Sequence, residues 1–476
     1  MDTDVLIVGA GPTGLALGID LARRGVRALV VERGETLTPG SRGKGLQPRT
    51  MEVYEDLGVL DAILDAGGPY PVGMIWRDGE QVGEHMMFDP AEDGGADGEE
   101  NGGVDGGQGS RFATPWMVPQ WRNQEILRAR LEELGGGVVF GREVVGVEQD
   151  ADGVTARFVS GAPVRARYAV AADGGRSAVR RALGIGMTGE TVDPDPVLVA
   201  DVRISGLSRD HWHIFPPHDE VGFLAICPLA GTEDFQLVAQ FPDGAGPDLT
   251  LGGIRKAVAD RTHLDPEDVT EVRWVSDFRP RAALADRFRE GRVFLAGDAA
   301  HVHSPAGGQG LNTSVQDAYN LGWKLGAVLG GRASADLLDT YEEERRPIAA
   351  HVLGLSTAIH RDEARRGTAT MQLGLGYRES SLAQETRQSP TGRIRAGDRA
   401  PDGTTEGVRL FDALRGPGWT LLTVGTRSSA PGLDPVHLPA HGAYGTGVFL
   451  IRPDGYVGWA GETTEGLDRY RATTGA

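Results

Sequence analysis

Residues 5–32 read VLIVGAGPTGLALGIDLARRGVRALVVE. Residues 5–8 are a short apolar run with no polar interruption, which is typical of a strand buried on both faces. A glycine-rich turn follows, then a helical spacing of leucine and alanine, then a second apolar strand that closes on Glu32. This unit of about 30 residues, with an acidic residue at its end, predicts a dinucleotide-binding fold.

Each glycine of the turn has a physical role. Gly9 permits a tight turn, Gly11 lets the backbone approach a pyrophosphate, and Gly14 lets the helix pack closely on the strand. The helix N-terminus offers N–H groups and a positive dipole end to that pyrophosphate, and Glu32 is placed to accept hydrogen bonds from a ribose diol. The unit does not distinguish FAD from NAD. It predicts cofactor contacts from Gly9, Gly11, Pro12, Thr13, Gly14, Glu32 and Arg33.

Two later stretches also have a strand followed by a glycine-containing turn, a pattern that indicates cofactor binding. Asp173-Gly174 follows the small-residue strand 168–172 and precedes a helix predicted over 178–183. Gly297-Asp298 follows the apolar strand 292–296, which places the Asp298 carboxylate where a ribityl hydroxyl can donate to it. The segment 305–312, PAGGQGLN, lacks large side chains and opens a long helix predicted over 311–329. Backbone N–H groups at that helix start would stabilise the negative charge of a reduced flavin at N1–C2=O.

Taken in this order, the three stretches resemble the class A FAD-dependent aromatic hydroxylases, which share the para-hydroxybenzoate hydroxylase fold. The resemblance is closest to the aromatic polyketide and phenol hydroxylase branch, and it extends from residue 3 to about residue 350, and more weakly beyond. It implies an FAD-dependent monooxygenase that hydroxylates a polycyclic polyketide or phenolic substrate with O2, through a C4a-hydroperoxyflavin. NADPH or NADH would be the transient reductant, without a domain of its own.

The resemblance also implies residues for the site. Arg42 and Gln120 match contacts to the FAD phosphates and ribityl region, and the Asp173-Gly174 motif serves both FAD and the nicotinamide cofactor. Arg49 is predicted to be catalytic by stabilising the peroxide or the substrate oxygen. Pro305 is predicted to lie under the flavin ring, as a catalytic and cofactor contact. The remaining predicted cofactor contacts are Asp298, Gly308, Gly310, Leu311 and Asn312, and the predicted substrate contacts are His213, Phe215, Trp116 and Trp121.

We expect an α/β fold of three parts. Residues 1–186 and 286–390 would form a Rossmann-like FAD-binding domain, and residues 187–285 a substrate domain whose mixed antiparallel sheet roofs the flavin. Residues 397–476 resemble the thioredoxin-like C-terminal domain of the phenol hydroxylase branch, here without CxxC. Residues 89–110 are rich in Gly, Asp and Glu and predict a mobile acidic loop; a calcium-binding repeat and an acidic flap over the site are the alternatives.

Composition narrows the classes of partner. The chain has 67 acidic and 48 basic residues and a net charge of −19, which disfavours nucleic acid and anionic membranes. No apolar run approaches the ~20 residues of a membrane span and no signal peptide is visible, so we expect a cytoplasmic enzyme, as a monomer or homodimer. The single cysteine, Cys227, excludes an internal disulfide. His301 and His303 lack further ligands at metal spacing, so no metal is expected.

Several alternatives stay open. The same fold can perform Baeyer–Villiger insertion or inactivate an aromatic antibiotic, and the motifs above are common to these reactions. A halogenase would carry a Trp-x-Trp-x-Ile-Pro motif and a Ser/His/Asp hydrolase a Gly-x-Ser-x-Gly elbow, and the sequence has neither. A flavin-binding interaction protein is the non-enzymatic alternative. The sequence leaves open the substrate, the position oxidised and the choice between NADPH and NADH.

Overall fold

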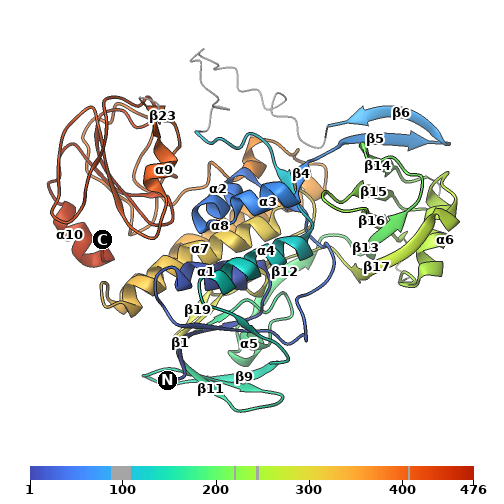
Figure 1. The fold of residues 1–476 in the computed structure, drawn as a ribbon, viewed down its shortest axis with the longest axis horizontal. Coiled ribbons are helices and arrows are strands. Elements are labelled where there is room, and N and C mark those ends of the chain that lie inside the picture. Colours follow the sequence, from blue (N-terminus) through green and yellow to red (C-terminus); the bar gives the residue numbers. More distant parts are fainter. Residues whose placement is uncertain (87–108, 219–220, 243–245, 406–407) are drawn as a thin grey trace.

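A computed structural model describes residues 1–86, 109–218, 221–242, 246–405 and 408–476 of the chain. Figure 1 shows a central body of helices on a sheet, a second large sheet on one side of it, and the C-terminal residues forming a separate domain on the other side. The predicted acidic loop at 89–110 lies outside the described residues, except for Gly109 and Ser110.

An eight-stranded sheet forms one layer of the central body (Figure 1). Its main path runs β19-β20-β11-β1-β2-β8, with β1 parallel to both neighbours, while β10 joins β11 to β9 by antiparallel pairing. The predicted strand at 5–8 is confirmed, and Val5, Leu6 and Ile7 have no exposed surface. The strands are β1 Thr3–Val8, β2 Ala28–Val31, β8 Val138–Val139, β9 Val144–Gln149, β10 Val154–Phe158, β11 Val164–Ala171, β19 Arg289–Glu290 and β20 Val293–Leu295.

Helices cover this sheet and pack on one another. The first of them, α1 (Pro12–Ala22), is buried along almost its whole length because it packs against the sheet, α4 and α7. A Cβ atom built on its Gly18 would lie 3.3 Å from Leu131 Cδ1 and from Val30 Cγ2, so the helix packs closely at this point. The other helices of the central body are α2 Pro48–Leu57, α3 Leu60–Ala66, α4 Gln120–Glu133, α5 Ala178–Ala182, α7 Gly310–Leu329 and α8 Thr340–His360.

The second large sheet has seven strands in the order β17-β13-β16-β15-β14-β5-β6. Helix α6 (Leu251–Arg261) covers its outer face, away from the central body (Figure 1). Two of its strands, β5 and β6, come from outside the predicted range 187–285, because β5 pairs in parallel with β14 from far away in the chain. The strands are β5 Val72–Arg77, β6 Glu80–His85, β13 Val197–Ile204, β14 His211–Phe215, β15 Leu224–Pro228, β16 Phe235–Gln240 and β17 Val269–Phe278.

The C-terminal domain contains a five-stranded sheet in the order β22-β28-β27-β25-β26, with α10 (Leu467–Thr474) packed against it. The thioredoxin-like assignment of this domain stays a prediction. Its strands are β22 Gln384–Glu385, β25 Thr420–Val424, β26 Val436–Leu438, β27 Gly447–Ile451 and β28 Val457–Gly461, and α9 spans Leu410–Leu414.

Short pairings complete the fold. Two three-stranded sheets and one two-stranded sheet contain the remaining strands. They consist of β3 Gly45–Leu46, β4 Gly68–Pro69 and β7 Trp116–Met117; of β12 Met187–Thr191, β18 Arg281–Ala285 and β21 His301–Val302; and of β23 Thr404–Thr405 and β24 Val408–Arg409. Among the described residues, no helix has the length and apolar character needed to cross a membrane.

Candidate active site

The three glycine-containing stretches meet in space. A Cβ atom built on Gly9 would lie 3.1 Å from Asp173 Cα, so the first and second stretches touch. A Cβ atom on Gly297 would lie 2.6 Å from Thr13 Oγ1, so the third stretch touches the first. These contacts place the ends of β1, β11 and β20 beside the N-termini of α1 and α7, as a cofactor spanning all three stretches requires.

The turn between β1 and α1 contains glycines with two different kinds of surroundings. Gly9 has φ of +106°, and a Cβ there would lie 2.3 Å from the carbonyl oxygen of Ala172. A Cβ on Gly14 would lie 2.0 Å from the carbonyl oxygen of Gly9, so both positions are closed by the protein's own backbone. Gly11, in contrast, has no atom within 4 Å of its built Cβ. The space over Gly11 is therefore open where a pyrophosphate would approach the helix N-terminus.

Glu32 ends β2 and is fixed by the backbone of the turn. Its Oε2 accepts a hydrogen bond from Ala10 N at 2.9 Å and its Oε1 accepts one from Gly34 N at 3.0 Å. A carboxylate oxygen can accept more than one hydrogen bond, so both oxygens keep capacity for a ribose diol. The neighbouring Arg33 is exposed.

Asp173 caps the helix that follows it. Its Oδ2 accepts hydrogen bonds from Ala178 N at 2.8 Å and from Val179 N, whereas its buried Oδ1 has no partner among the described residues. Burial raises the pKa of this carboxyl, against the hydrogen bonds that favour its ionised form. Arg180 ties this motif to the third, donating to the carbonyls of Ala299 at 2.9 Å and Gly175 at 3.0 Å. No sequence motif pointed to Arg180.

The third stretch presents exposed groups at the start of α7. Asp298, Pro305 and Gly308 are exposed, and no side chain caps the helix N-terminus, so its N–H groups stay available. Asn312 has another role: it is buried, its Oδ1 accepts from Gln47 N at 2.8 Å, and its Nδ2 donates to the carbonyls of Gly45 and Gly308. The buried Asn312 side chain therefore holds the backbone around this turn in place through hydrogen bonds. Gly310 and Leu311 are partly buried beside it.

A buried ion network holds the Gly297-Asp298 turn. Asp317 Oδ2 accepts from Gly297 N at 3.0 Å and pairs with His301 Nε2 at 2.6 Å, while Arg345 Nε donates to Oδ1 at 2.7 Å. Burial opposes ionisation of Asp317, but His301 and Arg345 outweigh it and lower the pKa of this carboxyl. His303 Nε2 lies 2.9 Å from His301 Nδ1. Within the described ranges, no group of three or more His, Cys, Asp or Glu is arranged to hold a metal ion.

The segment leading into α2 brings two further predicted contacts to the same place. Gln120 Oε1 accepts from Gly43 N at 2.9 Å, and a Cβ on Gly43 would lie 3.4 Å from Leu311 Cδ1. Arg42 is exposed and its guanidinium lies 5.8 Å from the ring centroid of Trp274, on the seven-stranded sheet. Arg42, Gln120 and Leu311 therefore lie close together, between the two sheets.

Two predicted substrate contacts, His213 and Phe215, lie on the face of the seven-stranded sheet that is turned away from the central body. His213 and Phe215 are buried on the side that α6 covers; the His213 ring contacts the Ser208 carbonyl through Nε2 at 2.8 Å and accepts from Trp76 Nε1 at 3.2 Å. Side chains alternate along a strand, so an error of one residue reverses the face. Trp212 points instead toward the central body, where Lys44 Nζ lies 4.4 Å from its ring centroid.

The other side chains that were predicted to contact the substrate or the peroxide have the following surroundings in the structure. Trp116 packs against the central core and donates from Nε1 to the Ile63 carbonyl at 3.2 Å, whereas its neighbour Met117 lines a pocket. Trp121 is half-buried on α4. Arg49 is buried against the C-terminal domain, donating from Nη1 to Glu52 and from Nη2 to the Asp454 carbonyl at 2.7 Å. Its position favours a structural role in place of the predicted catalytic one.

Replacing Phe215 by alanine is expected to destabilise the protein by about 3–5 kcal/mol, because a large side chain leaves the core beneath α6. FAD affinity should stay unchanged, since the side chain faces away from the central body. Urea unfolding and FAD titration measure the two quantities. Trp212→Ala, on the opposite face, is the matched variant and should raise the substrate KM. An increase in KM for Phe215→Ala without loss of stability would contradict this assignment of the faces.

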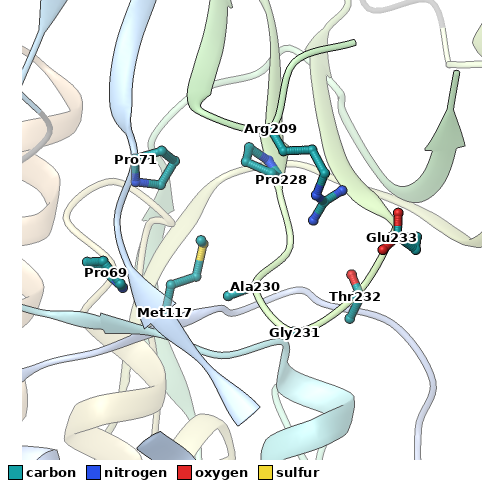
Figure 2. Close-up of a pocket in the computed structure, with 9 residues that line it drawn as sticks. All are labelled: Pro69, Pro71, Met117, Arg209, Pro228, Ala230, Gly231, Thr232 and Glu233. Atoms are coloured by element: carbon teal, nitrogen blue, oxygen red, sulfur yellow. The ribbon is translucent and has the colours of Figure 1, made fainter. Parts of the chain in front are cut away.

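A pocket of about 510 Å³ lies where the seven-stranded sheet meets the central body (Figure 2). Figure 2 shows Pro69, Pro71 and Met117 on one side and residues of the β15–β16 connection on the other. Its volume is within the range of small-molecule sites, and its lining combines apolar residues with the polar side chains of Arg209, Thr232 and Glu233. The full lining is Pro69, Pro71, Met117, Arg209, Pro228, Ala230, Gly231, Thr232 and Glu233.

The residues present fit FAD. The open space over Gly11, the oriented Glu32 carboxylate and the exposed Asp298 and Gly308 are the groups that the two phosphates, the ribose, the ribityl chain and the ring would need. When bound, FAD supplies the redox and oxygen-activating chemistry. The chain itself contributes binding, orientation and exclusion of water.

Comparison with known proteins agrees with this geometry. The family model described as FAD binding domain matches residues 2–356. The chain is 46% identical to a flavin-dependent monooxygenase of Mycobacteroides abscessus, covering 98% of this chain and 99% of that one, and 33% identical to a rifampicin monooxygenase of Rhodococcus hoagii, covering 99% and 98%. The solved ternary complex of aklavinone-11 hydroxylase with FAD and aklavinone superposes with a TM-score of 0.81 at 30% identity, covering 100% of this chain and 99% of that one. The chain thus belongs to the FAD binding domain family and is an FAD-dependent monooxygenase.

Proposed function

We propose that this monooxygenase hydroxylates a polycyclic aromatic substrate of the polyketide or phenol type, with NADPH or NADH as reductant. The observation that carries the proposal is the pocket of about 510 Å³ where the seven-stranded sheet meets the central body. Tyr70, between the lining residues Pro69 and Pro71, stacks on Trp212 with ring centroids 6.1 Å apart. These rings lie beside the pocket and are not part of its lining, and aromatic neighbours of this kind suit a flat aromatic ligand. The solved relative that binds FAD and aklavinone together supports the same substrate class.

The site residues would contribute to the reaction by binding the flavin and by excluding water. The exposed Asp298 and Gly308 would hold the flavin at the start of α7, and Arg42 would reach the phosphates from the segment before α2. The seven-stranded sheet covers this end of the central body and would exclude water from the reacting atoms. We infer a cytoplasmic enzyme acting on a small molecule; NADPH against NADH is decided by measuring KM for each.

Product analysis with labelled O2 tests the proposal. FAD-loaded protein, a reductant and a panel of polycyclic phenols should give substrate-stimulated oxidation of the nicotinamide and a product heavier by one labelled oxygen, carried as a ring hydroxyl. Stimulated oxidation with no oxygen in any product would contradict hydroxylation.

A second candidate is oxidative inactivation of an aromatic antibiotic, favoured by the identity to a rifampicin monooxygenase over nearly the whole chain. The same experiment separates the candidates. Incorporation of the labelled oxygen into a ring-expanded ester identifies Baeyer–Villiger insertion, and conversion of an antibiotic with loss of its growth inhibition identifies inactivation.

A further inference from the structure

One lateral row of side chains crosses the inner face of the seven-stranded sheet. The strand register sets Trp274 opposite Asp201, Asp201 opposite Gln236, and Gln236 opposite Cys227. Trp212 on β14 continues this face toward β5. The row meets the segment before α2, since Gln236 Nε2 donates to the Ser41 carbonyl. Polar and aromatic side chains therefore line the sheet where it covers the central body.

Lys44, in the segment before α2, contacts this row. It is 9% exposed, its Nζ donates to Gln236 Oε1, and the same nitrogen lies 4.4 Å from the Trp212 ring centroid. Tyr70 closes the other side, with its ring stacked on Trp212 and its hydroxyl against Gly45. The chain contains only three lysines, at 44, 256 and 324. A buried lysine, unlike a buried arginine, exchanges its proton readily.

Lys44 has no carboxylate in ion-pair contact among the described residues, and neither has Arg366, whose charge acts on Lys44 and Tyr70. Burial lowers the pKa of Lys44 and Arg366 lowers it further, whereas the charges of Cys227 and Asp201 oppose this. Asp201 is a weak counter-charge, because burial raises its own pKa to about 6. These surroundings favour the neutral amine of Lys44, which can accept a proton from an acidic ligand and then pair with the resulting anion.

A second observation indicates a ligand at the same point. Trp212 Nε1 is buried and has no hydrogen-bond acceptor among the described residues. Unpartnered buried donors are rare in folded proteins because they lose their bonds to water. The pocket of Figure 2 adjoins this row without including it: its lining residues Pro69 and Pro71 flank Tyr70, and Sδ of its lining residue Met117 lies 3.8 Å from Cys227 Sγ.

We propose that Lys44 and Trp212 bind an ionised ring hydroxyl of the substrate, which would make the preferred substrates acidic phenols or enols. This inference rests on the proposed function and specifies its substrate class. The O–H bond breaks, the oxygen keeps the electron pair, and the proton is taken by Lys44 Nζ, which is then an ammonium ion beside the phenolate. The phenolate oxygen enriches the ring in electrons, as transfer of an oxygen atom to it requires. Lys44 is thereby a positioning and charge-stabilising residue.

The test uses the FAD-loaded full chain and two probes. Quinizarin is a polycyclic phenol whose anion absorbs at longer wavelength than its neutral form, and its dimethyl ether cannot ionise. Wild-type protein should shift bound quinizarin to the anion spectrum and bind it at least about tenfold more tightly than the ether, equivalent to ~1.4 kcal/mol. Lys44→Met should lose the anion spectrum and this preference. Lys44→Arg, which keeps the positive charge, should retain part of both.

Lys256→Met is the matched control, because Lys256 is on the outer helix α6 and pairs with the exposed Asp260 at 2.7 Å. It should behave as wild type, and the FAD content of all variants should be equal. An anion spectrum that survives in Lys44→Met, or equal affinity of the wild type for the two probes, would overturn the role of Lys44 while leaving the hydroxylase proposal intact. Binding of neither probe by the wild type would overturn both.

Discussion

Replacing Gly11 by alanine is expected to raise the Kd for FAD at least about tenfold, or ~1.4 kcal/mol, with little change in the stability of the apoprotein. A methyl group at this position meets no protein atom within 4 Å, so the fold does not resist it. It would occupy the space through which the pyrophosphate approaches the N-terminus of α1. Gly11 is also the N-cap of α1, where alanine costs about 1 kcal/mol or less relative to glycine.

Titration of apoprotein with FAD, followed by flavin fluorescence, measures this effect. Two further variants are needed to interpret the change in the Kd for FAD. Gly14→Ala should lose stability as well as FAD, because its methyl group would lie 2.0 Å from the Gly9 carbonyl oxygen and α1 would have to move. Gly354→Ala, at an exposed and open position of α8, should bind FAD as the wild type does. Wild-type affinity in Gly11→Ala would show that the pyrophosphate does not lie over Gly11.

The first cofactor unit was predictable because its determinants are local. The apolar strand, the glycine spacing and the acidic residue at the end of β2 lie within 30 residues, and each acts on its own turn of the chain. The contacts among the three stretches follow from the parallel sheet, since β1, β11 and β20 end at the same edge. The long helix after Gly310 begins within one residue of its predicted start.

The substrate side was not predictable in the same way. The strand containing His213 and Phe215 has aromatic side chains on both faces, with Phe215 on one and Trp212 on the other, so periodicity alone does not choose the inner one. The choice depends on α6, which follows later in the chain and buries Phe215, and on Lys44, which meets Trp212 from the first domain. Likewise, Arg49 is committed to Glu52 and Asp454, and the latter is about 400 residues away in sequence.

A large stability effect is expected at Glu344, where α7, α8 and the C-terminal domain meet. Its carboxylate accepts from Arg452 at 2.6 and 2.9 Å, from Lys324 and Asn320 at 2.7 Å, and from Ser380 at 2.8 Å, and it has no exposed surface. Burial opposes ionisation, but Arg452 and Lys324 outweigh it and hold the pKa of Glu344 well below its ordinary value. Removing one partner of such a buried network leaves the others uncompensated.

Glu344→Gln is therefore expected to lower the free energy of unfolding by about 3–5 kcal/mol, measured by urea unfolding. Limited proteolysis should show earlier release of residues beyond 400. The matched control is Asp260→Asn, which removes an exposed ion pair and should cost less than about 1 kcal/mol. Because the folded-state pKa is depressed, the contribution of Glu344 is complete above its unfolded pKa of about 4.3 and is lost as the pH falls below it. The stability difference between wild type and Glu344→Gln should accordingly shrink in acid, and a difference that is the same at pH values well below the unfolded pKa would show that the charge of Glu344 does not hold the domains together.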